Sequence, residues 1–185
     1  MRLFLLGVAA LSLAACDSGK VPSPAERLQG DDAQAGAGID ENLVVLRGDG
    51  LIAGAEAFYF AAGRTEVEAA LASALGEATE RNDLPECGAG PMASTDYPGG
   101  LTVNFQNGNL VGWILGNAEN TEATINVSSD AGIGTARTEL EAISGYNAIE
   151  DSTLGEEFII SGEVAGFVEE DAVSMLYSGV QCFFR

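Results

Sequence analysis

The sequence predicts an α+β domain in which two short helices accompany an antiparallel β-sheet. Three observations support this fold class. The segment Arg64–Ala69 (Arg-Thr-Glu-Val-Glu-Ala) recurs 73 residues later as Arg137–Ala142 (Arg-Thr-Glu-Leu-Glu-Ala), and both segments look like helix starts. An Asn107-Gly108 pair separates two strand-like runs, as in a β-hairpin. Strand-like runs follow both helical segments, so the order of elements indicates a degenerate tandem repeat of a helix followed by strands.

The first fifteen residues have the three parts of an export signal. Arg2 gives a positive start, Leu3–Leu13 is an uncharged apolar run, and Leu13-Ala14-Ala15-Cys16 closes it. The run is too short to span a bilayer as a stable helix. The final tetrad resembles the bacterial lipobox at every position, which implies that Cys16 is diacylated, in the manner of a palmitate-bearing lipoprotein. We predict residues 1–15 as signal peptide; the alternative is a secreted protein in which Cys16 is accidental.

The lipid on Cys16 is the predicted attachment to the membrane, on the periplasmic side of the cell envelope. No other apolar run approaches about 18 residues, so the mature chain is not expected to span the membrane. Asp17 follows the cysteine, and in the best-known sorting rule aspartate at this place favours the inner membrane. Because that rule varies between bacteria, both the inner and the outer membrane stay open.

Residues 16–41 are predicted as the lipidated cysteine and a flexible tether, since they are rich in Pro, Gly and Ala. Residues 42–185 are then enough chain for one α+β domain with a real core. Without residues 1–15, seven Lys and Arg stand against 28 Asp and Glu, a net charge near −21. This charge argues against nucleic acid as a partner and permits cationic partners, although a solvated acidic surface also explains it.

The first helix is predicted from Glu66 to about Leu75, with Gly76 as its stop. In both repeated segments a Thr precedes a Glu by three residues, which is the pattern of a capping box. The second helix is expected to be shorter and to end near Gly145.

The clearest hairpin consists of residues 101–106 and 109–115 around a type I′ turn. In a two-residue hairpin, one face is predicted to be core and carries Leu101, Val103, Phe105, Leu110 and Ile114. The opposite face then carries Val111, Trp113 and Leu115, which would form a partner-binding patch if they are exposed. The alternative is that a helix buries this face. Further strands are predicted at Asn42–Arg47, Ala57–Phe60, Glu122–Val127, Glu157–Ser161, Val164–Val168, Ala172–Tyr177 and Gln181–Phe184.

Cys87 and Cys182 remain once Cys16 is lipidated, and two thiols in an oxidising compartment are expected to form a disulfide. The alternative is two separate buried thiols. The segment Cys87–Pro91 (Cys-Gly-Ala-Gly-Pro) is predicted as a tight turn that holds this disulfide, although its successive amides could instead cradle an anion.

Several residue types that catalysis commonly needs are missing from the predicted domain. The chain has no His, and its one lysine, Lys20, lies in the tether, which excludes His-based triads, His-based zinc sites and Lys nucleophiles. The segment Gly132–Arg137 starts like a dinucleotide fingerprint but has Arg in place of the third Gly. The acidic runs Glu156-Glu157 and Glu169–Asp171 are interpreted as solvated turns. We therefore expect no enzyme activity, no cofactor and no metal site.

Four segments resemble a group of small bacterial lipoproteins, namely Glu86–Pro91, Gly100–Phe105, Gly112-Trp113 and Ser152–Phe158. The resemblance covers most of residues 43–185 and implies no known reaction. Some proteins of that group carry an aspartate-semialdehyde dehydrogenase label, which this sequence does not support. In its order of elements the chain is also similar to outer-membrane-assembly lipoproteins of the SmpA/OmlA (BamE-like) kind and to the repeats of β-lactamase inhibitory proteins.

Together these features predict a non-catalytic, lipid-anchored envelope lipoprotein that binds another protein or helps to organise an assembly. Two other classes stay open. A hydrolase of envelope glycans that uses carboxylates alone would need a cleft with two carboxyl groups about 5–10 Å apart. A carrier of a small ligand or a cation would be stabilised against unfolding by that ligand.

Overall fold

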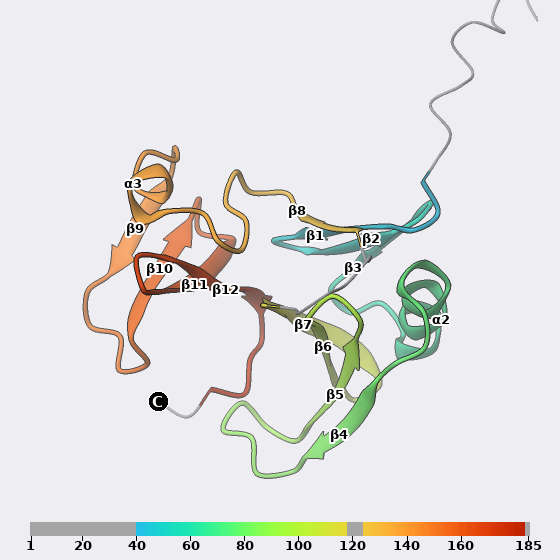
Figure 1. The fold of residues 1–185 in the computed structure, drawn as a ribbon. Coiled ribbons are helices and arrows are strands. Elements are labelled where there is room, and N and C mark those ends of the chain that lie inside the picture. Colours follow the sequence, from blue (N-terminus) through green and yellow to red (C-terminus); the bar gives the residue numbers. More distant parts are fainter. Residues whose placement is uncertain (1–39, 118–123, 184–185) are drawn as a thin grey trace, which may run out of the picture. The chain divides into compact units, whose positions relative to one another are not determined.

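The structure is a computed structural model, and it describes residues 40–117 and 124–183 of the 185-residue chain. The described residues form mainly antiparallel sheets with two short helices, as predicted (Figure 1). In chain order the elements are β1 (Leu43–Arg47), β2 (Gly50–Ala53), β3 (Glu56–Tyr59), α2 (Arg64–Leu75), β4 (Glu80–Leu84), β5 (Met92–Tyr97), β6 (Leu101–Gln106), β7 (Asn109–Gly116), β8 (Thr124–Val127), α3 (Arg137–Leu140), β9 (Tyr146–Ile149), β10 (Glu156–Ile160), β11 (Val164–Glu169) and β12 (Ala172–Gly179).

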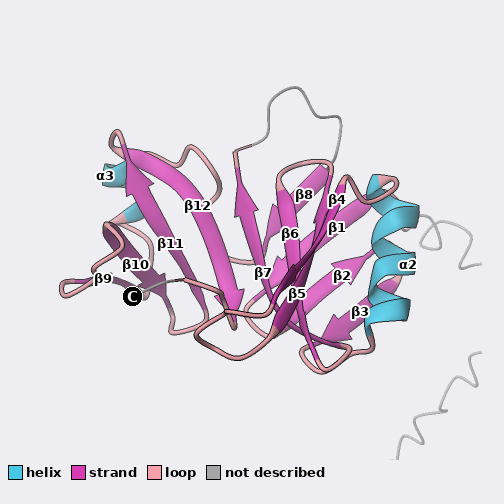
Figure 2. Ribbon diagram, turned by 90° about the horizontal axis from the view of Figure 1, so that it is seen from below, coloured by secondary structure: helices cyan, strands magenta, loops and turns pink. Residues whose placement is uncertain are grey.

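The strands form two sheets. Sheet A has the order β3-β2-β1-β8, and sheet B has the order β4-β5-β6-β7-β12-β11-β10-β9. All neighbours pair antiparallel except β1 and β8, which are parallel. Sheet B consists of two four-stranded meanders, which we call its first half (β4 to β7) and its second half (β9 to β12). They join where β7 pairs with β12, and Figure 2 shows these two strands side by side.

The hydrophobic core lies on one face of sheet B, which we call the core face, against sheet A and α2. Its largest fully buried side chains are Trp113, Phe105 and Phe158. Both central strands of sheet B also reach sheet A through hydrogen bonds. Trp113 Nε1 donates to the Arg47 carbonyl oxygen at 2.8 Å, and Ser178 Oγ donates to the Gly48 carbonyl oxygen at 2.7 Å. Apolar burial and these polar contacts together hold the two sheets to each other.

The second face of sheet B carries the side chains that alternate with the core residues. A row of paired residues crosses five strands on this face, namely Asp96, Thr102, Ile114, Tyr177 and Ala165. The flanking rows are Ser94, Asn104, Gly112 and Gly179 on one side, and Glu157, Phe167 and Met175 on the other. In Figure 1 the sheet is curved, and the C-terminal segment leaves β12 on the side away from sheet A.

Each half of sheet B contains a β-bulge in its last hairpin. The register shifts between Asn104 and Phe105 in β6, and again 63 positions later, between Phe167 and Val168 in β11. Both hairpins turn through two residues with positive φ, which is the geometry of a type I′ turn. Asn107-Gly108 was predicted to form such a turn; Glu170-Asp171 forms one without the Asn-Gly signature.

The first helix, α2, begins two residues before the predicted start and ends at the predicted Leu75. The capping-box prediction is wrong for both helices, because neither has a side-chain hydrogen bond at its N-cap. Tertiary contacts set both starts instead. The Arg64 amide donates to the Gly108 carbonyl oxygen at 2.9 Å, and the Arg137 amide donates to the Asp171 carbonyl oxygen at 2.8 Å. Neither helix in the described part of the chain is long and apolar enough to cross a membrane.

Most predicted strands lie within two residues of observed ones, but there are two kinds of error. Residues 181–183 of the predicted strand Gln181–Phe184 are irregular, because side-chain contacts rather than strand pairing hold them. Four strands were not predicted, namely β2, β4, β5 and β9. These are short or polar, as the Ser, Thr and Asp of β5 illustrate, and only the neighbouring strands make them part of a sheet.

Candidate functional site

Cys16, the predicted lipidation site, lies outside the described residues, as does nearly all of the tether. The lipid anchor therefore stays a prediction from the sequence. The described residues allow the other predicted sites to be located.

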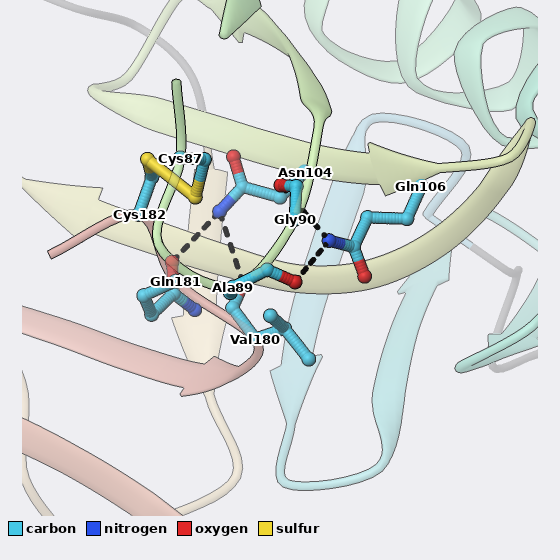
Figure 3. Close-up of a disulfide and its surroundings, with 8 residues drawn as sticks. All are labelled: Cys87, Ala89, Gly90, Asn104, Gln106, Val180, Gln181 and Cys182. Atoms are coloured by element: carbon cyan, nitrogen blue, oxygen red, sulfur yellow. Dashed lines mark hydrogen bonds between the residues drawn. A yellow bond between two sulfur atoms is a disulfide. The ribbon is translucent and has the colours of Figure 1, made fainter. Parts of the chain in front are cut away.

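Cys87 and Cys182 form a disulfide, with their Cα atoms 5.3 Å apart (Figure 3). Cys87 lies in the β4–β5 connection, in a turn where the Gly90 amide donates to the Cys87 carbonyl oxygen at 2.9 Å. Cys182 lies just after β12. The disulfide thus ties the outer part of the first half of sheet B to the segment that leaves the second half. We call the disulfide, together with residues 85–91 and 180–183, the clasp.

Polar side chains of β6 hold the clasp against the second face of sheet B. Asn104 Nδ2 donates to Gln181 Oε1 at 2.7 Å and to the Val180 carbonyl oxygen at 3.3 Å (Figure 3). Gln106 Nε2 donates to the Ala89 carbonyl oxygen at 3.0 Å. Asn104 is only 2% exposed as a result, and its buried amide is satisfied by these partners. The clasp therefore covers part of the first half's second face.

The predicted binding patch of Val111, Trp113 and Leu115 is wrong, because Trp113 is fully buried and Leu115 is 6% exposed. The bulge in β6 and β7 is the physical reason. Phe105 pairs with Leu110 but Asn104 pairs with Gly112, so Val111 is an additional residue and every later side chain of β7 changes face. Trp113 consequently joins the core face. Sheet A covers it, rather than the helix that the alternative interpretation expected.

The second half of sheet B carries an aromatic cluster on its second face. The rings of Phe167 and Tyr177 stack with centroids 5.7 Å apart, and Phe183 of the clasp meets both rings edge-on, at 5.7 Å and 5.0 Å. Phe183 lines two hollows. One, of about 340 Å³, lies toward Gly88 and Gln181; the other, of about 230 Å³, lies against Phe167 and Met175. Aromatic rings beside such hollows can receive an apolar or cationic side chain.

Glu157 lies beneath this cluster and is 3% exposed. The Tyr177 hydroxyl donates a hydrogen bond to Glu157 Oε1. The interpretation of Glu156-Glu157 as a solvated turn is therefore wrong: both residues lie in β10, and alternation sends Glu157 to the second face. The hydrogen bond between Tyr177 and this buried carboxyl group fixes the position of the Tyr177 ring within the aromatic cluster.

Glu156 points the other way and contributes to a surface cluster around Arg137. Arg137 Nη2 contacts Glu156 Oε2 at 2.5 Å, and its Nε contacts Asp171 Oδ1 at 2.9 Å. These hydrogen bonds, first that to Asp171 and then that to Glu156, raise the pKa of Arg137 above its ordinary value. The predicted solvated turn does apply to Glu170 and Asp171, whereas Glu169 is the last residue of β11; all three residues are exposed.

The corresponding arginine of the first half, Arg64, lies in a less exposed cluster. Its Nε donates to Glu68 Oε1 at 3.0 Å, and Thr95 Oγ1 donates to the same oxygen at 2.7 Å. Burial raises the pKa of Glu68, but the hydrogen bonds from Thr95 and Arg64 and the charges of Arg64 and Arg81 together hold this pKa below its ordinary value. Burial, followed by the charge of Glu68, raises the pKa of the neighbouring Tyr97 to about 12. This cluster fastens α2 to sheet B.

A hollow of about 640 Å³ lies near the ends of β7 and β8 and is lined by Asn117, Asn126 and Asp130 among others. It borders residues 118–123, which the structure does not describe, so it is not assigned as a site. Within residues 40–117 and 124–183, no group of three or more His, Cys, Asp or Glu side chains is placed to hold a metal ion.

Comparison with known proteins supplies no relative from which a function could be transferred. No protein-family model matches the chain, and neither a curated protein nor a solved structure gives a significant match.

Phe167, Tyr177 and Phe183 were not predicted as site residues, although all three were placed in strands. The alternation of β11 and β12 around the Glu170-Asp171 turn could have put Phe167 and Tyr177 on one face. Nothing local in the sequence indicates that Phe183 folds back onto them, because the disulfide determines that path.

Proposed function

We propose that this protein is a non-catalytic, lipid-anchored envelope lipoprotein that binds another protein through the second face of sheet B. The observation that carries the proposal is the cluster of Phe167, Tyr177 and Phe183, which lies between two hollows on a sheet stiffened by a disulfide. Aromatic residues in such positions are typical anchors of protein interfaces. Val180 of the same clasp is one of two large hydrophobic side chains that are exposed in the described part of the chain.

The proposed location rests on the sequence of the first sixteen residues. The apolar leader and the Leu13-Ala14-Ala15-Cys16 tetrad support export and lipidation. A tether of roughly 25 residues has a root-mean-square reach of about 25–30 Å. Such a reach lets the second face meet partners beyond the lipid headgroups while the lipid keeps the domain on the periplasmic side of the envelope.

We also infer that the domain is a tandem repeat of one unit, a helix followed by four strands. Several correspondences support this inference. The hairpin β6–β7, at residues 101–116, and the hairpin β11–β12, at residues 164–179, are equal in length and lie 63 positions apart. Each has its bulge at the same place, and each turn accepts the first amide of the preceding helix. The residue before each helix also bridges to the first residue of the last strand, as Gly63 to Asn109 and as Ala136 to Ala172.

Binding rather than catalysis is supported by the roles that the carboxylates already have. Glu156 and Asp171 hold Arg137, and Glu68 holds Arg64 and Thr95. Glu157 is buried under Tyr177. We therefore assign these carboxylates structural roles rather than catalytic ones.

The proposal can be tested by changing the second face in full-length protein and purifying it from membranes. Ile114→Asp places a charge in the middle of this face, and Ser73→Asp is the matched control on the exposed side of α2. We expect a co-purifying envelope protein, quantified by mass spectrometry, to be lost with Ile114→Asp and retained with Ser73→Asp.

A second variant separates lost binding from lost folding. Thr102→Arg changes a half-buried position in the same row of the second face and replaces a polar side chain rather than an apolar one. Equal retention of the partner by wild type, Ile114→Asp and Thr102→Arg would exclude the second face as the binding surface.

A further inference from the structure

The smaller hollow beside the aromatic cluster has a wall and a rim of different chemistry. Its wall is apolar and consists of Leu154, Phe167, Met175 and Phe183. Its rim carries Ser174 and the exposed carboxylate of Glu169. A site of this kind does not match a purely aliphatic side chain, because the carboxylate would lose hydration without gaining a partner.

Glu169 has no cation of its own within the described residues. The five ion pairs there engage Arg47, Arg64, Arg81 and Arg137, and none of them includes Glu169 or Glu170. Every arginine in residues 40–117 and 124–183 is thus already paired with a carboxylate, and these ranges contain no lysine. The whole chain carries a formal charge of −20, so a cation brought by a partner is favoured by the surrounding field as well.

We propose that this hollow binds a lysine or arginine side chain of the partner protein, which deepens and rests on the binding function proposed above. The aliphatic stem packs on Phe167, Met175 and Leu154, while the charged head lies at Glu169. Lys and Arg side chains commonly pack their aliphatic stems on apolar surface and keep their charged heads in contact with solvent. The ring of Phe167 or Phe183 adds a cation–π contact, which is favourable within about 6 Å of a ring centroid.

The occupant is therefore a basic segment of a protein that presents a Lys or Arg side chain to this hollow. The larger hollow, toward Gly88 and Gln181, lies on the other side of Phe183 and leaves room for a neighbouring side chain of the same segment. Phe183 separates the two subsites, and the disulfide at Cys182 holds it there.

The test is a titration of full-length protein in detergent micelles with two defined peptides, followed by methyl NMR. The first peptide is acetyl-Ser-Lys-Phe-Lys-Ser-amide, and the second has Glu in place of both Lys. We expect the lysine peptide to shift the Met175 and Leu154 methyl signals saturably, and the glutamate peptide to leave them unchanged. Glu169→Gln should weaken binding of the lysine peptide about two- to fivefold, as for the loss of one exposed ion pair.

Glu56→Gln is the matched control, because it removes one exposed charge from β3 of sheet A. Equal weakening by Glu56→Gln and Glu169→Gln would mean that only the total charge matters, and would overturn the site. Equal binding of both peptides would overturn it too. A gain in peptide affinity on Arg185→Gln would overturn the site, because it would mean that the chain's own Arg185 competes for Glu169.

The outcomes separate this inference from the proposed function. If membranes yield a partner that needs Ile114 but the lysine peptide does not bind, the basic side-chain site is wrong and the binding surface stands. If the lysine peptide binds at Met175 while no partner depends on the second face, the site stands and the proposed function is wrong.

Discussion

The two halves of sheet B share a frame and differ in what they present on the second face. Both end in a 16-residue hairpin with a type I′ turn and a bulge, and both receive a helix amide at the turn. In the first half the second face is mainly polar in β5 and β6, and it holds the clasp through Asn104 and Gln106. In the second half it is aromatic, with Phe167 and Tyr177 over Glu157.

We propose that this difference separates a structural role of the first half from a binding role of the second half. The first half is preceded by α2, a helix of 12 residues, and is joined to it by the less exposed cluster of Arg64, Glu68 and Thr95. The first half also positions the clasp. The second half has a helix of four residues and a surface ion cluster, and it keeps its aromatic side chains beside hollows. We infer that the first half contributes most of the stability and the second half most of the binding.

The central strands offer the largest test of this comparison. Trp113 in β7 and Leu176 in β12 are at corresponding positions, and both are fully buried. Trp113→Ala should lower the free energy of unfolding by about 4 kcal/mol, since it leaves a large cavity and removes the hydrogen bond to sheet A. Leu176→Ala should cost about 3 kcal/mol. Urea denaturation measures both, and a larger loss for Leu176→Ala would contradict the stability ranking.

Breaking the clasp should have the next largest effect. The disulfide spans 95 residues, and removing a native disulfide of a small secreted domain typically costs about 2–5 kcal/mol, mainly because the unfolded chain regains freedom. We expect about 3 kcal/mol for the double variant Cys87→Ser, Cys182→Ser. Asn104 should then become accessible, which amide-side-chain NMR in the same variant would detect. Unchanged stability would show that the polar contacts of β6 hold the clasp without the disulfide.

A pair of glycines tests whether the halves pack differently at corresponding positions. A Cβ atom on Gly179, at φ +76°, would lie 2.2 Å from the Val111 carbonyl oxygen, whereas a Cβ atom on Gly116 would meet nothing within 4 Å. Gly179→Ala should therefore cost about 2 kcal/mol through overpacking and backbone strain. Gly116→Ala should stay within about 0.5 kcal/mol of wild type. Thermal unfolding of both variants measures these losses of stability. Equal losses for Gly179→Ala and Gly116→Ala would refute the packing difference.

The smallest expected effect concerns pH. The pKa of Glu68 in the folded protein lies below its ordinary value of 4.5, so its stabilising contribution is present above that value and is lost as the pH falls through the folded pKa. Because 20% of the Glu68 side chain is exposed, solvent screens its ion pairs, and its contribution to the free energy of unfolding should stay below about 1 kcal/mol. The difference in unfolding free energy between wild type and Glu68→Gln should shrink between pH 6 and pH 3. A difference that grows over this range would reverse the sign of our argument.

Local patterns in the sequence were sufficient for several elements. The repeated segments predicted both helices, although α3 ends at Leu140 and the predicted end near Gly145 is wrong. The Asn107-Gly108 turn predicted its hairpin, and export predicted that Cys87 and Cys182 would pair. The register of that hairpin could not be predicted, because the bulge depends on packing Trp113 against sheet A. Glu157 was missed for a similar reason: only the strands on both sides of β10 make a site where a carboxyl group is buried.

The candidate site was even less accessible from the sequence. Phe183 lies beyond the end of β12, outside the sheet, and it meets Phe167 and Tyr177 because the clasp turns the chain back at Cys182. Short strands such as β4 and β9 likewise owe their pairing to neighbouring strands rather than to their own composition.

The central claim is that the second face, above all in its second half, is the surface that binds a partner. Photo-crosslinking in intact cells tests it most directly, with the crosslinking amino acid at position 175 in the second half, at 102 in the first half, and at 73 on α2. The account predicts one dominant protein adduct from position 175, a weaker one from 102 and none from 73. An adduct from position 73 that equals or exceeds the adduct from position 175 would contradict it.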